Sequence, residues 1–213
     1  PNVRLVDRRL PVRGLNAALF TVGFSAFVSS GQRCTCARRL LLPDSQWGDD
    51  FFVALLQHCS ELSVANGLQQ PQPFMGAVIS TDAARQLQDG IRLLESLGGK
   101  ILLAPRLLNP QQTLMTPALV DMSHAQQIFD EELFGPVLQI FRYRDRAHAI
   151  ELANATRFGL AAGVISDDSA GFDDYYRHLR PAIVNFNKPL TGASSEAPFG
   201  GIGASGNHRF SAF

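Results

Sequence analysis

The sequence predicts an α/β fold in which a mainly parallel sheet is covered by helices. Short apolar runs alternate with segments whose apolar residues recur every three or four positions. This alternation is typical of parallel sheets, because each parallel pair of strands needs a crossover connection. The 213 residues are 46% hydrophobic and 18% charged, which suits one globular core. We therefore expect one domain, with its functional loops beyond the carboxyl ends of the strands.

The first part of the chain predicts one helix and one buried strand. Residues 1–14 predict no regular element, because their apolar positions are isolated among four arginines. A helix follows, since one buried face is formed by Leu15, Leu19, Val22 and Ala26. Residues 40–42 are three leucines, a run short enough for a buried strand.

The middle of the chain predicts two further helices. The first covers about residues 48–65, begins at Asp49 and Asp50, is stopped by Gly67, and carries Cys59 on its apolar stripe. The second is capped by Thr81 and closed by a pair of glycines, and its apolar face carries Ala84, Leu87, Ile91 and Leu94.

The remaining elements alternate between strand and helix. Residues 100–104 predict a strand, whereas in residues 113–120 the pair Thr116-Pro117 favours an edge strand or a kink over a central strand. The later strands and helices are predicted at residues 137–141, 145–153, 162–166, 172–179 and 182–185.

Composition excludes several classes of partner. The chain holds 19 basic and 19 acidic residues, so nothing favours nucleic acid or a membrane surface as a partner. No apolar run approaches the ~18 residues of a membrane span, and no secretory leader is recognised. Three cysteines are an odd number, which predicts reduced thiols and a cytoplasmic protein. Cys34-x-Cys36 supplies two metal ligands at best, so we expect no metal site.

Cys34 is the candidate nucleophile. It lies in a turn of small residues between the first helix and the leucine strand, with Gly31 at the junction. A thiol held there can have nearby backbone N–H groups directed at a substrate oxygen as negative charge develops on it. Arg33, Arg38 and Arg39 are close in sequence and would favour the thiolate. The alternative is a structural cysteine, because cysteine is often buried as a small hydrophobic residue.

Two motifs resemble the NAD(P)-dependent aldehyde dehydrogenases. The family's cysteine signature is matched by Phe27, Gly31, Gln32, Cys34 and Arg39, and its second signature by residues 131–137, Glu-Glu-Leu-Phe-Gly-Pro-Val. The resemblance implies that Cys34 attacks the aldehyde. It also implies that Glu132 accepts hydrogen bonds from the ribose hydroxyls beside the nicotinamide, and that Phe134 packs against the nicotinamide. NAD is the expected cofactor, with NADP as the alternative.

A third motif covers residues 185–206. Gly201-x-Gly203-x-x-Gly206 fits a dinucleotide-binding pattern by letter count, but the residues that remain are too few for the required helix and acidic residue. A tight glycine-rich turn is the better interpretation.

The same motif resembles the substrate-binding region of the family. The resemblance implies that Phe199 lines the aldehyde channel and that Gly192 and Ala193 belong to an anchor loop, which begins at Thr191 and holds a substrate carboxylate. The hydroxyl of Thr35, directly after the cysteine, would assist that loop.

The resemblance also implies a substrate and a larger enzyme. The wider pattern is most similar to family members that oxidise N-succinylglutamate semialdehyde in arginine breakdown, with glutamate semialdehyde as the alternative. We recognise no general-base glutamate, cofactor-binding part or oligomerisation part. We therefore expect residues 1–213 to be the catalytic domain of a homo-oligomeric enzyme, inactive alone as a dehydrogenase. A residual thiol esterase and a non-catalytic assembly domain are the alternatives.

Overall fold

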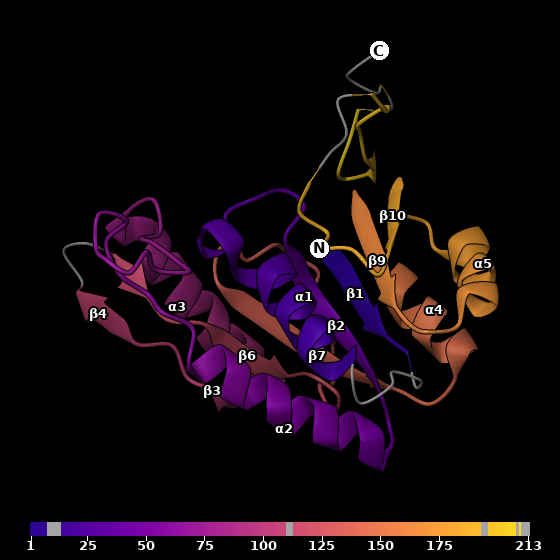
Figure 1. Ribbon diagram of the computed structural model, residues 1–213, viewed down its shortest axis with the longest axis horizontal. Coiled ribbons are helices and arrows are strands. Elements are labelled where there is room, and N and C mark those ends of the chain that lie inside the picture. Colours follow the sequence, from indigo (N-terminus) through magenta and orange to yellow (C-terminus); the bar gives the residue numbers. More distant parts are fainter. Residues whose placement is uncertain (8–13, 110–112, 193–195, 208, 210–213) are drawn as a thin grey trace.

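A seven-stranded sheet forms the centre of the protein (Figure 1). The computed structural model describes residues 1–7, 14–109, 113–192, 196–207 and 209. In spatial order the strands are β10 (Ile183–Phe186), β9 (Ala161–Ile165), β1 (Asn2–Val6), β2 (Ala37–Pro43), β7 (Val137–Tyr143), β6 (Ala118–Asp121) and β3 (Lys100–Leu103). All neighbours run parallel except β3, which is antiparallel to β6. The predicted mainly parallel α/β fold is confirmed.

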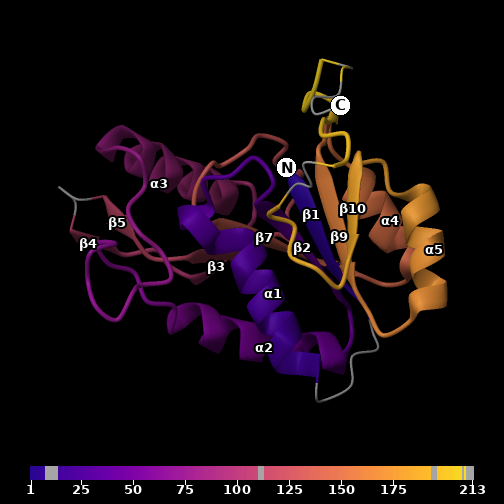
Figure 2. The same cartoon turned by 45° about the horizontal axis from the view of Figure 1, so that its top comes forward.

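Helices cover both faces of this sheet, as the two views in Figures 1 and 2 show. On one face, α1 (Leu15–Phe27) and α2 (Gln46–Ser60) share a hydrophobic cluster with Leu40 and Leu42 of β2. On the other, α3 (Thr81–Ser96), α4 (Arg146–Asn154) and α5 (Ser169–His178) share a cluster with Leu41. Successive leucines face opposite layers because side chains alternate along a strand.

The strand β1 was missed by the sequence analysis, which predicted no element in residues 1–14. Asn2 and Arg4 obscure its alternation, yet both are buried, with 5% and 0% of their surface exposed. The Arg4 guanidinium donates to Ser25 Oγ at 3.3 Å and to the Lys188 carbonyl. Burial lowers the pKa of Arg4 to about 9. β1 therefore occupies a central place in the sheet despite its polar residues.

The predicted bounds of α2 were wrong at both ends. The helix begins before Asp49, because Ser45 caps it by accepting a hydrogen bond from the Gly48 N–H. It ends at Ser60 rather than near residue 65, since residues 63–65 make backbone hydrogen bonds to Met75 instead. The placement of Cys59 in the core is confirmed: its side chain is 0% exposed, and burial raises the pKa of its thiol to about 12.

Two further details differ from the prediction. Ser80, not Thr81, caps α3 by accepting from the Ala83 N–H. β6 is not an edge strand, because it lies between β7 and β3. The predicted kink is confirmed, since Thr116 and Pro117 separate β6 from β5 (Leu114–Met115), which pairs with β4 (Leu107–Asn109).

The predicted strands at residues 100–104, 137–141, 162–166 and 182–185 correspond to β3, β7, β9 and β10. A small antiparallel pair is formed by β8 (Phe158–Gly159) and β11 (Ile202–Gly203). Among the described residues, no helix has both the length and the apolar character needed to cross a membrane.

Candidate active site

The turn between α1 and β2, residues 28–36, is the centre of the site, and we call it the cysteine turn. It opens with the short helix η2 (Val28–Gly31), in which Ser29, Ser30 and Gly31 have φ values of 54°, 56° and 68°. Left-handed backbone is unfavourable for serine and costs about 1–2 kcal/mol per residue. Strain of this kind persists where surrounding contacts impose it, and it is often found at functional sites.

Side chains of the cysteine turn form hydrogen bonds with the backbone of residues 76–79. Ser30 Oγ donates to the Gly76 carbonyl at 2.8 Å. Gln32 donates to the Ala77 carbonyl at 3.3 Å and accepts from the Ile79 N–H at 2.8 Å. These contacts join segments about 45 residues apart, and they offset the backbone strain. Sequence reasoning missed this role of residues 76–79, because their side chains take no part in it.

Cys34 is the exposed cysteine of this chain, whereas Cys36 and Cys59 are buried. It lies in a turn closed by a hydrogen bond from the Cys36 N–H to the Arg33 carbonyl at 3.0 Å. Within the described ranges, the N–H groups of Cys34 and Thr35 donate to no protein acceptor. The site therefore presents an exposed thiol beside two backbone N–H groups that bond no acceptor among the described residues. Burial raises the pKa of the Cys36 thiol and therefore disfavours its thiolate form.

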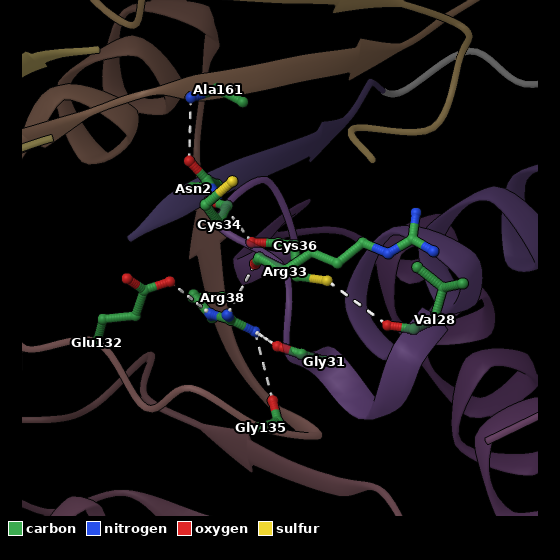
Figure 3. Close-up of polar contacts among 10 residues, drawn as sticks. All are labelled: Asn2, Val28, Gly31, Arg33, Cys34, Cys36, Arg38, Glu132, Gly135 and Ala161. Carbon is green, nitrogen blue, oxygen red and sulfur yellow. Dashed lines mark hydrogen bonds and ion pairs between the residues drawn. The ribbon is translucent and has the colours of Figure 1, made fainter. Parts of the chain in front are cut away.

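Asn2 holds the backbone of Cys34 and of the residues that follow it, as Figure 3 shows. Its Nδ2 donates to the Cys34 carbonyl at 2.6 Å and to the Cys36 carbonyl at 2.9 Å, while its Oδ1 accepts from the Ala161 N–H at 3.0 Å. The sequence pattern did not predict a role for Asn2. The available signal was asparagine at the start of a strand, where this residue type is depleted.

The second part of the site is the acidic loop, residues 129–136, which leads into β7. Arg38 Nε lies 3.0 Å from Glu132 Oε1, and the Arg38 guanidinium lies 5.1 Å from the centre of the Phe134 ring. The Glu132 side chain is 27% exposed and Phe134 is 46% exposed. The fold thus brings two predicted cofactor-binding residues to the cysteine turn, about 100 residues away in the chain.

The sequence predicted that three arginines near Cys34 would favour its thiolate, whereas in the structure their side chains contact other groups. Arg38 and Arg39 lie in β2 and are buried, with 1% of each exposed. Arg39 Nη2 pairs with Asp130 at 3.0 Å, and burial lowers the pKa of Arg39 although Asp130 raises it in part. Arg33 Nε donates to Ser29 Oγ at 2.9 Å. Arg38 and Arg39 therefore tie the acidic loop to the sheet.

The predicted substrate-binding residues are more dispersed. Thr35 is buried with 5% of its surface exposed, whereas Gly192 is exposed and has a φ of 146°. Ala193 lies outside the described residues. Leu190, just before the anchor loop, donates its N–H to Ser25 Oγ of α1 at 3.2 Å. In the described part of the chain, no hydrogen bond or ion pair joins Gly192 to the cysteine turn.

Phe199 is half-buried, and the glycine-rich segment after it forms a tight turn. Gly203 has a φ of 57°, and a Cβ on Gly206 would lie 2.0 Å from the Gly201 carbonyl oxygen. The segment contains β11 rather than a helix. This geometry agrees with the interpretation of the glycines as a turn.

Comparison with known proteins decides the family. The sequence model of the aldehyde dehydrogenase family matches residues 12–212. The chain belongs to the aldehyde dehydrogenase family. It is 52% identical over 203 residues to the N-succinylglutamate 5-semialdehyde dehydrogenase of Hahella chejuensis, covering 95% of this chain and 41% of that enzyme. It is 50% identical over 212 residues to the enzyme of the same name from Ectopseudomonas mendocina, covering 100% of this chain and 43% of that enzyme.

Solved structures of aldehyde dehydrogenases share this fold. A Thermus 1-pyrroline-5-carboxylate dehydrogenase with bound NAD superimposes with a TM-score of 0.84 at 29% identity, covering 95% of this chain and 38% of that one. An aldehyde dehydrogenase from Burkholderia cenocepacia gives a TM-score of 0.89 at 24% identity, covering 100% and 43%, and shows likeness of fold alone. The chain spans about two fifths of the length of the curated relatives that it matches.

Proposed function

We propose that this chain is the cysteine-bearing catalytic domain of an NAD(P)-dependent aldehyde dehydrogenase that converts an aldehyde to a carboxylic acid. The observation that carries the proposal is the exposed Cys34 beside two unpaired backbone N–H groups, with Glu132 and Phe134 joined to the same turn through Arg38. Membership of the aldehyde dehydrogenase family supports the oxidation of an aldehyde as the class of reaction. The cofactor-binding and oligomerisation parts would lie in other segments of a larger enzyme.

The residues of the chain supply the covalent steps. The Cys34 thiolate forms a bond from Sγ to the aldehyde carbon, and the N–H groups of Cys34 and Thr35 stabilise the resulting oxyanion. Loss of a hydride from that carbon restores the carbonyl group and leaves a thioester. Water then adds to the thioester, the carbon–sulfur bond breaks, and the acid leaves with the thiol regenerated.

Two side chains fit a nicotinamide cofactor. Glu132 is partly exposed and, even with one oxygen paired to Arg38, has further acceptor positions for the hydroxyls of a ribose. Phe134 presents an exposed ring that an aromatic heterocycle can pack against. When bound, the cofactor supplies the acceptor for the hydride. NAD is the proposed cofactor, and NADP is the alternative.

The proposed substrate is N-succinylglutamate semialdehyde, an aldehyde of arginine breakdown. Two relatives that are 52% and 50% identical to this chain carry this substrate in their names. The alternative is glutamate semialdehyde, which the likeness to the Thermus dehydrogenase supports. We also propose that the larger enzyme is a cytoplasmic homo-oligomer, with three reduced cysteines in this domain.

Hydrolysis of an ester by the Cys34 thiol tests the proposed nucleophile directly. Because the thiol and the N–H groups are already together, the purified chain should hydrolyse a p-nitrophenyl ester without a cofactor. Cys34→Ala should abolish this turnover, whereas the matched variant Cys36→Ala, which removes a buried thiol, should keep it. Turnover that survives in Cys34→Ala would contradict the proposal.

A second assay tests the proposed extent of the domain. The 213-residue chain should form no NADH when mixed with NAD and either semialdehyde, because the cofactor-binding part lies elsewhere. Steady NADH formation by this chain would show that it is a complete dehydrogenase, and the proposed division of the enzyme would be wrong. Ester turnover without NADH formation is the residual thiol esterase activity that the free N–H groups favour.

A further inference from the structure

Arg38 is buried and uses all three of its guanidinium nitrogens, as Figure 3 shows. Nε pairs with Glu132 Oε1 at 3.0 Å. Nη1 donates to the Gly31 carbonyl at 2.6 Å and to the Gly135 carbonyl at 3.4 Å, and Nη2 donates to the Arg33 carbonyl at 3.2 Å. One side chain therefore makes four polar contacts with two separate segments.

These contacts join the cysteine turn to the acidic loop. Gly31 and Arg33 are on the cysteine turn, and the Arg33 carbonyl also accepts the hydrogen bond that closes the turn around Cys34. Glu132 and Gly135 are on the acidic loop. The guanidinium is a rigid planar fork, so a shift of one partner changes the geometry available to the others. Burial strengthens the contacts with the Gly31 and Gly135 carbonyls, because water does not compete for them.

We propose that Arg38 is a positioning residue that couples the Glu132 carboxylate to the reactivity of Cys34. The inference rests on the proposed function, in which Glu132 receives hydroxyl groups of the cofactor and Cys34 is the nucleophile. A hydroxyl that donates to Glu132 shares the carboxylate with Arg38. The guanidinium then shifts its remaining hydrogen bonds toward the Gly31 and Arg33 carbonyls, and this sets the orientation of the Cys34 backbone.

The neighbouring Arg33 offers a matched control. It is adjacent to Cys34 in the chain and carries the same charge as Arg38, but its side chain is exposed and, among the described residues, its hydrogen bond is to Ser29 Oγ alone. Arg33→Met therefore removes a positive charge near the thiol and leaves the bridge from Glu132 intact. Arg38→Met removes a positive charge and the bridge together, with a side chain of similar length.

The test measures the labelling rate of Cys34 by iodoacetamide across pH, resolved by peptide mass spectrometry. Glu132→Gln is introduced into the wild-type chain, into Arg33→Met and into Arg38→Met. In the wild-type chain and in Arg33→Met, we expect Glu132→Gln to change the labelling rate of Cys34 by about fivefold or more, which is the lower end of the range of coupling between sites in proteins. In Arg38→Met, we expect Glu132→Gln to leave that rate unchanged. The pH profile should also shift in the first two chains only. A purely structural role for Arg38 would leave the effect of Glu132→Gln unchanged.

Two outcomes would overturn the inference: an effect of Glu132→Gln that is equal in all three backgrounds, or no effect in any of them. If Arg38→Met does not fold, as judged by circular dichroism, Arg38→Lys takes its place under the same criteria, since lysine keeps the charge but lacks the fork. The assay uses neither aldehyde nor cofactor. Failure of the coupling is therefore distinguishable from failure of the proposed function, which the ester turnover of Cys34→Ala reports separately.

Discussion

Replacing Gly31 by alanine should separate the cysteine turn from the acidic loop. A Cβ at this position would lie 2.2 Å from the Gly135 carbonyl oxygen and 2.5 Å from its carbon, where ordinary contacts begin at 3.4 Å. One of the two backbones must therefore move by about 1 Å. Gly31 also has a φ of 68°, a conformation that glycine adopts freely and alanine does not.

The expected loss of stability follows from these two terms. Left-handed backbone costs alanine about 1–2 kcal/mol, and overpacking against a well-packed neighbour costs about 1–3 kcal/mol. We expect Gly31→Ala to lower the free energy of unfolding by about 3 kcal/mol in urea denaturation. We also expect the iodoacetamide labelling rate of Cys34 to change, because the same movement displaces the turn that holds the thiol.

Two other glycines separate strain from steric overlap. Gly192 has a φ of 146°, but among the described residues no atom lies within 4 Å of the place that a Cβ would take, so Gly192→Ala should lose only the strain term of about 1–2 kcal/mol. Gly67 has neither a left-handed φ nor a neighbour within 4 Å, so Gly67→Ala should leave the stability almost unchanged. If Gly31→Ala proves as stable as Gly67→Ala, the close approach of the two segments does not exist in solution.

Three further predictions concern Asn2 and the cysteines. Asn2→Ala removes hydrogen bonds to two buried backbone groups and one partly buried group, and it should lower the free energy of unfolding by about 2–4 kcal/mol in urea, whereas Asn66→Ala, an exposed control, should lose well under half of that; equal losses would contradict the role of Asn2. Because the folded pKa of Cys59, about 12, is raised above its ordinary value of 9.0, its contribution to stability is complete below pH 9 and is lost as the pH rises toward 12. The wild-type chain should therefore lose about 1 kcal/mol more than Cys59→Val between pH 8 and pH 10, as measured by urea unfolding, and parallel profiles would refute this. Iodoacetamide at neutral pH should label Cys34 before Cys36 and Cys59 in the native chain and all three alike in urea; a native Cys36 that reacts first would contradict the assigned burial.

The fold class could be predicted from the residue pattern, and the same pattern proposed Cys34 as the centre of the site. Strand and helix periods differ, so the alternation of apolar runs and amphipathic segments predicted the parallel sheet without knowledge of contacts. The two signatures also predicted Cys34, Glu132 and Phe134 as site residues, and in the structure Arg38 contacts both Glu132 and Phe134. Helix ends were less predictable, because Ser45 and Ser80 each had acidic or hydroxyl competitors within a few residues.

The contacts that hold the site together could not be predicted from the residue pattern. The central position of β1, the three contacts of Asn2 and the contacts of Arg38 with Glu132 and Gly135 depend on groups far away in the chain, most of them backbone groups. A carbonyl or an N–H is the same in every residue, so a sequence pattern does not record which one a side chain will bind. Burial of Asn2 and Arg38 becomes favourable only when those distant partners are in place, and the fold alone supplies them.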